Sequence, residues 1–93
     1  MVIGTLEVEI ILHDCHSLKD KRSIVKSIID RVRNRFNVSV AEVDCLDLHQ
    51  RSIIGIGVVS NDRRFANSIL DQIADFIENI NIAKVGEIKI EVS

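Results

Sequence analysis

Apolar and polar residues follow two different periodicities along the chain. Alternation with period two is typical of a strand buried on one face, and a spacing of three or four residues is typical of an amphipathic helix. Four segments alternate and are predicted to be strands: residues 2–12, 38–45, 52–60 and 84–92. Two segments, residues 18–36 and 62–80, have the helical spacing. The predicted order is therefore strand, helix, strand, strand, helix, strand.

Local signals at the boundaries support these elements. Ser17 is the predicted N-cap of the first helix, and Asn61-Asp62 forms the cap signal of the second. Val40 and Val43 are out of phase in the second strand, which indicates either a β-bulge or a loosely specified edge.

This order of elements has one common solution, an α+β fold of the ferredoxin-like type. The βαββαβ sandwich places four antiparallel strands in one sheet and both helices on one of its faces. The first and third strands are expected to be central, and the second and fourth to be edges. We predict a single domain over residues 1–93, large enough to bury roughly 60–70% of its unfolded surface.

Composition predicts an ordinary soluble globule. Apolar residues make up 46% of the chain and charged residues 28%, which is typical of a globular domain. We find no signal-peptide pattern, and no apolar run approaches the ~20 residues that span a bilayer. We therefore expect a cytoplasmic protein with no membrane partner. Two cysteines do not make a disulfide framework in such a chain.

The net charge of −2 conceals a strongly basic first helix. Residues 17–37 carry +5, residues 62–80 carry −2, and the rest of the chain carries −5. Four cations share an arc of about 60° on a helical wheel, beside the buried face, and are called the basic ridge: Lys19, Arg22, Lys26 and Arg33. Such a row suits phosphate backbones or an acidic protein partner. The predicted binding residues are the four ridge cations and Arg51. The alternative is an ordinary solvated helix face.

Lys21 differs from the ridge cations because it points into the buried arc of the same helix. Its ammonium must either extend past the sheet edge to water or pair with a carboxylate. We predict a structural ion pair between Lys21 and Asp14 or Asp44.

Four motifs resemble those of the DUF503, or YlxP-like, family of small bacterial proteins: "SLKDKR" at 17–22, "RFNVSVAEVD" at 35–44, "QRS" at 50–52 and "VVSND" at 58–62. They span almost the whole chain in the family's order and spacing. The resemblance implies a ferredoxin-like fold. Genes of this family often lie among translation and ribosome-maturation genes, so the resemblance also implies a ribosomal RNA or ribosomal-particle partner. His49 departs from the family, which commonly has tryptophan before the Gln-Arg pair.

The sheet face away from the helices is not expected to bind RNA. RNA-recognition motifs stack bases on aromatic side chains of the two central strands. The aromatic residues of this chain, Phe36, Phe65 and Phe76, all lie on the predicted helices in apolar phase. The open face instead carries carboxylates, which repel phosphate: Glu7, Glu9, Glu87 and Glu91.

The same face carries apolar residues and two glycines that a second copy of the chain would cover. The candidate dimer-interface residues are Ile3, Ile11, Ile53, Gly55, Gly57 and Val59. The two glycines are expected to leave a shallow groove along a central strand. We predict an isologous homodimer, sheet against sheet. The alternative is a half-exposed sheet with scattered apolar side chains.

Histidines and cysteines are expected to gather at one end of the sheet. The residues placed there are His13, Asp14, Cys15, His16, Cys45, Asp47, His49 and Arg51. These side chains include zinc ligands, but their spacing matches neither a CxxC pair nor a helical i,i+4 pair. We favour polar loop residues and semi-buried thiols, with no metal and no cofactor.

Three functional hypotheses follow. We recognise no nucleophile–base pair and no glycine-rich phosphate loop, so the sequence favours a non-enzymatic role. The leading hypothesis is an accessory protein that docks on ribosomal RNA or a ribosomal particle through the first helix. The alternatives are a homodimeric small-ligand-binding or regulatory module, and a metal-dependent enzyme or sensor at the His/Cys end.

Overall fold

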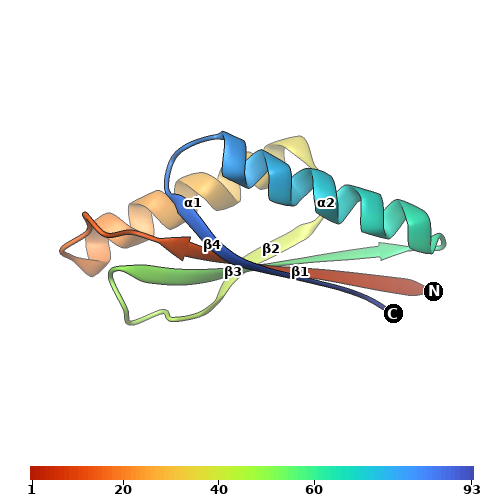
Figure 1. The fold of residues 1–93 in the computed structure, drawn as a ribbon, viewed down its shortest axis with the longest axis horizontal. Coiled ribbons are helices and arrows are strands. Elements are labelled where there is room, and N and C mark those ends of the chain that lie inside the picture. Colours follow the sequence, from red (N-terminus) through yellow and green to blue (C-terminus); the bar gives the residue numbers. More distant parts are fainter.

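A computed structural model describes all residues, 1–93, and has the predicted βαββαβ order. The elements are β1 Val2–Ile11, α1 Leu18–Arg35, β2 Ser39–Asp44, β3 Arg51–Ser60, α2 Arg63–Asn79 and β4 Lys84–Val92. The strands form one antiparallel sheet in the order β2-β3-β1-β4, so β1 and β3 are central as predicted. Both helices cover one face of this sheet and leave the other face open (Figure 1).

The core lies between the sheet and the two helices. The helix-facing residues of β1, including Leu6, Val8 and Ile10, are completely buried, as their alternation predicts. Each such side chain contributes roughly 1.5–3 kcal/mol by leaving water. At Gly4 the second helix comes so close to β1 that an added Cβ would lie 2.8 Å from Leu70 Cδ1. A side chain at this position would have to displace the end of Leu70, so glycine permits the observed packing of α2 on the sheet.

Both predicted helix caps are present. Ser17 is the N-cap of α1, and its Oγ accepts a hydrogen bond from the backbone N–H of Asp20 at 3.1 Å. Asp62 is the N-cap of α2, and its carboxylate accepts from the backbone N–H of Arg64 at 2.9 Å. Each cap satisfies one of the backbone donors that a helix start leaves unpaired.

Of the two alternatives for the second strand, the structure shows the bulge. The pairing of β2 with β3 shifts between Glu42 and Asp44, so Val43 is the extra residue. Its side chain is 51% exposed and leans over Gly55 on the open face.

One core prediction is wrong. Phe65 has the apolar phase of the second helix, yet its side chain is 55% exposed. Ala66 takes the buried position in this first turn, where its Cβ faces Gly4 of β1. The other two aromatic rings, Phe36 and Phe76, pack edge to face at 5.6 Å.

Candidate functional site

Lys21 lies at the centre of a buried polar network between α1 and the β2–β3 hairpin. Its side chain is completely buried, as the helical wheel predicts, and its Nζ lies 2.6 Å from Glu42 Oε2. The ammonium also donates to the backbone carbonyls of Cys45 at 2.7 Å and Leu46 at 3.3 Å. Three acceptors thus surround the buried charge, which is the condition for burying an ammonium without a large penalty.

The predicted partner of Lys21 is therefore wrong: it is Glu42, not Asp14 or Asp44. Glu42 pairs across the sheet with Ile54, which faces the helices, so both side chains point toward α1. Asp44 follows the bulge, and its carboxylate accepts from the backbone N–H of Cys45 at 2.7 Å instead. Asp14 is exposed in the loop before α1.

Residues of three motifs meet in this network. Ser52 is completely buried and donates from its Oγ to Glu42 Oε2 at 2.7 Å. The side-chain amide of Gln50 donates to the backbone carbonyls of His13 and Cys15 at 3.3 and 3.2 Å. These bonds tie the hairpin loop after β2 to the loop that precedes α1, at the same end of the molecule (Figure 1). The network fixes how α1 sits beside β2.

All four residues of the basic ridge are exposed on α1, and none of them forms an ion pair. The ion pairs of the chain are Lys21–Glu42 and Arg51–Glu9. Arg33 is held in place because its guanidinium donates to the backbone carbonyl of Val40 at 2.9 Å. The ridge therefore presents unneutralised positive charge, with one of its arginines already oriented.

A groove of about 360 Å³ runs between α1 and β2 beside the ridge. Three ridge cations, Arg22, Lys26 and Arg33, line it together with two carboxylates, Asp30 and Glu42. The remaining lining residues are apolar or small: Val25, Ile29 and Ala41. This combination brings cations and a nearly buried carboxylate to one concave surface.

Arg51 does not lie with the ridge. It is on the open sheet face, where its Nε lies 2.6 Å from Glu9 Oε2 and its NH1 donates to Cys45 Sγ at 3.1 Å. The hydrogen bond from Arg51 and the bond from the backbone N–H of Glu87 lower the pKa of Glu9. The same hydrogen bond to Glu9 raises the pKa of Arg51. The structure thus gives Arg51 a partner on the face opposite α1.

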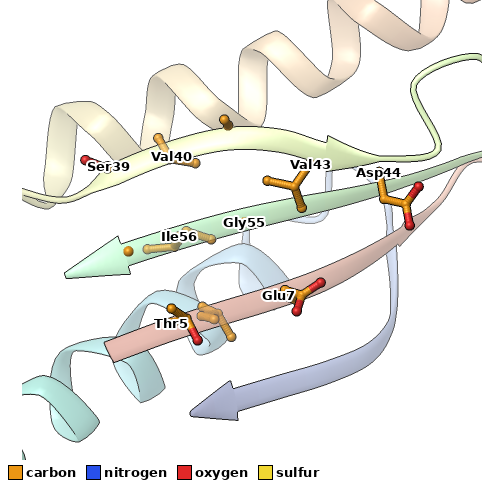
Figure 2. Close-up of a pocket in the computed structure, with 11 residues that line it drawn as sticks. Thr5, Glu7, Ser39, Val40, Val43, Asp44, Gly55 and Ile56 are labelled. Carbon is orange, nitrogen blue, oxygen red and sulfur yellow. The ribbon is translucent and has the colours of Figure 1, made fainter. Parts of the chain in front are cut away.

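The open face is hollowed along β3, between β1 and β2 (Figure 2). The groove has a volume of about 570 Å³ and is lined by residues that include Thr5, Glu7, Val43, Gly55 and Gly57. A Cβ on Gly55 would lie 2.7 Å from Val43 Cγ1, whereas a Cβ on Gly57 would meet nothing within 4 Å. Of the other predicted interface residues, Ile3 and Val59 are 44% and 65% exposed, and Ile11 and Ile53 are half-buried.

Comparison with known proteins gives a family match over nearly the full length. The family model described as "Protein of unknown function (DUF503)" matches residues 3–90. The chain belongs to the DUF503 family. It is 41% identical over 78 residues to "Uncharacterized protein YlxP" of Bacillus subtilis (strain 168), covering 84% of this chain and 85% of that protein. The family assignment expected from the four motifs is thus confirmed.

A solved structure supports the fold alone. The "De novo designed protein Foldit4" superposes with a TM-score of 0.60 at 13% identity, covering 99% of this chain and 94% of that one. Such low identity carries no functional information, so the functional argument for this DUF503 chain depends on its own residues.

The histidines and cysteines of this DUF503 chain do not form a metal-ligand cluster. No group of three or more His, Cys, Asp or Glu side chains has an arrangement that could hold a metal ion. Cys15 is buried, and Cys45 is half-buried at a left-handed backbone position with φ 61°. The histidines, His13, His16 and His49, are exposed. No helix is long and apolar enough to cross a membrane.

Sequence reasoning missed Glu42 and the groove that it lines. A signal was present, because Val40 and Glu42 share the strand phase that faces the helices. A carboxylate in the buried phase of a strand and a lysine in the buried arc of the preceding helix together predict an ion pair.

Proposed function

We propose that this DUF503 chain is a non-enzymatic accessory protein that docks on RNA, as ribosomal RNA or within a ribosomal particle, through the basic ridge. One observation carries the proposal: the four ridge cations are exposed and unpaired, and three of them line one groove. The ridge spans about 14 residues of helix, or roughly 21 Å at the helical rise. Such a row is suited to contact several phosphates of one strand.

One group of side chains resembles catalytic machinery, but its burial fits a non-enzymatic role. Ser52 donates to Glu42, and Glu42 pairs with Lys21, but Ser52 and Lys21 are completely buried. A nucleophile must reach the reacting carbon or phosphorus of its substrate, and a buried hydroxyl has no such access. These residues therefore serve to position α1 and β2.

Salt dependence tests the proposed docking. Binding that neutralises about four phosphates is expected to weaken about 50- to 150-fold between roughly 50 and 200 mM salt. The measurement is co-sedimentation with purified ribosomal particles, repeated as fluorescence anisotropy on a labelled ribosomal RNA fragment. Association that does not change over this range would show that phosphate contacts do not drive it.

The open face favours a second candidate function, a homodimeric ligand-binding or regulatory module. Its β2–β3 half carries uncharged residues, including Ala41 and Gly57 in the groove and the exposed Val59 farther along β3. Most carboxylates of this face are on the other half, on β1 and β4: Glu7, Glu9, Glu87 and Glu91. A two-fold axis through the β2–β3 half would bury the uncharged surface of both copies and keep their carboxylates apart.

Gly57→Glu tests this homodimer. The open space above Gly57 admits a glutamate without a clash, so the fold is expected to persist while charge repulsion separates the copies. Sedimentation velocity at tens of micromolar is expected to show a dimer for wild type and a monomer for the variant. Asn67→Glu adds the same charge on exposed α2 and is expected to leave the dimer intact. A monomeric wild type would refute the homodimer.

A further inference from the structure

The groove beside the basic ridge holds an unused carboxylate oxygen. Glu42 Oε2 takes both of the partners of this side chain, Lys21 Nζ at 2.6 Å and Ser52 Oγ at 2.7 Å. Oε1 makes no hydrogen bond or ion pair and is not fully buried, and the Glu42 side chain, 16% exposed, is among the residues that line the groove. The groove therefore offers one fixed acceptor among three cations.

Glu42 Oε1 can bind only a hydrogen-bond donor. An ionised carboxylate only accepts hydrogen bonds, so Oε1 repels phosphate oxygens and requires a donor. Along an RNA backbone the 2′-hydroxyl is a donor that lies close to the phosphates, and DNA lacks it. A groove with cations for phosphates and an anionic acceptor for a hydroxyl matches the ribose-phosphate backbone.

We propose that the groove between α1 and β2 selects RNA over DNA, because Glu42 Oε1 accepts a hydrogen bond from a ribose 2′-hydroxyl. Arg22, Lys26 and Arg33 contact the flanking phosphates. This inference rests on the proposed docking through the basic ridge, and it adds the chemical class of nucleic acid that the ridge takes.

The second carboxylate of the groove does not fill this role. Asp30 is exposed on α1 and forms neither an ion pair nor a side-chain hydrogen bond. Glu42 is oriented before RNA arrives, since Lys21 and Ser52 hold its other oxygen. Binding to a pre-oriented group costs less conformational entropy than binding to a free one.

Three labelled oligonucleotides of one sequence test the inference: RNA, 2′-fluoro RNA and DNA. The 2′-fluoro sugar keeps the RNA-like pucker and removes the donor. RNA is expected to bind about tenfold more tightly than 2′-fluoro RNA in anisotropy titrations at fixed salt, as for one hydrogen bond to a charged group. Equal affinity for the two would overturn the inference and leave phosphate docking intact. Absence of binding to all three at low salt would overturn the docking itself.

Variants then assign the selectivity to a residue. Glu42→Gln is expected to bring the affinity ratio of RNA to 2′-fluoro RNA close to one, because it removes the anionic acceptor. Asp30→Asn leaves Glu42 and both of its partners in place and is expected to keep the ratio of wild type. A ratio that falls in Asp30→Asn and not in Glu42→Gln would refute the role of Glu42. Should Glu42→Gln fail to fold, equal affinity of the wild type for RNA and 2′-fluoro RNA would still overturn the proposal.

Discussion

Lys21→Ala is expected to lower the free energy of unfolding by about 3–5 kcal/mol, as the loss of one partner of a buried ion pair does. The substitution leaves the Glu42 carboxylate, which is only 16% exposed, without its cation. It also removes the donor to the carbonyls of Cys45 and Leu46 and leaves space where the lysine stem packed. Urea denaturation followed by circular dichroism measures the change.

A double-mutant cycle separates the effect of the uncompensated carboxylate from the effect of lost packing. Lys21→Met keeps most of the buried volume and removes the charge, so it is expected to be destabilising as well. Adding Glu42→Leu removes the uncompensated carboxylate, and an apolar replacement of a buried pair is often neutral or stabilising. The double variant should therefore be more stable than Lys21→Met alone. A cost below about 1 kcal/mol for Lys21→Ala, the value of a surface pair, would contradict the buried-network interpretation.

The same network should control the order of the hairpin loop. Lys21 joins α1 to the loop carbonyls, and Gln50 joins the loop to the segment before α1. Leu46 and Leu48 remain about half exposed in this loop, so apolar burial holds it only in part. We attribute the position of the loop mainly to these polar contacts of Lys21 and Gln50.

The hydrophobic pattern predicted every element of the fold because each depends on local spacing. The burial of Lys21 was predicted for the same reason, since its direction follows from the helical period. The partner of Lys21 depends on the pairing of β2 with β3, and the bulge at Val43 changes which carboxylate faces α1. The periodicity of one segment contains no cross-strand register, so it points to Asp14 or Asp44 as the partner of Lys21 where the structure has Glu42.

Two other differences have tertiary causes. Phe65 is exposed because its neighbour Ala66 takes the position in the first turn of α2 that faces Gly4 of β1. The sequence adds Arg51 to the binding set of the basic ridge, whereas its strand phase directs it to Glu9 on the other face. Helix periodicity predicted the ridge correctly, but a groove is formed by two elements and needs their relative placement.

Reversing two ridge charges, Arg22→Glu with Lys26→Glu, is expected to weaken RNA association at low salt by more than tenfold and to flatten its salt slope. Both side chains are exposed, unpaired and part of the groove, so the change replaces two phosphate contacts with repulsion. Thermal stability should be nearly unchanged, because both residues are exposed and neither forms an ion pair.

A matched variant distinguishes a specific effect of the basic ridge on RNA binding from the effect of the protein's net charge. Arg64→Glu with Lys84→Glu makes the same change in net charge at exposed positions on α2 and β4, away from the groove. General repulsion between protein and RNA would weaken binding equally in both double variants, whereas docking through the ridge predicts a large loss only for Arg22→Glu with Lys26→Glu. Lys21→Ala should differ from both, lowering stability more than affinity, because its ammonium never reaches the surface. If the ridge variant binds RNA as tightly as wild type, then α1 is a solvated helix face and the cations have no role in docking.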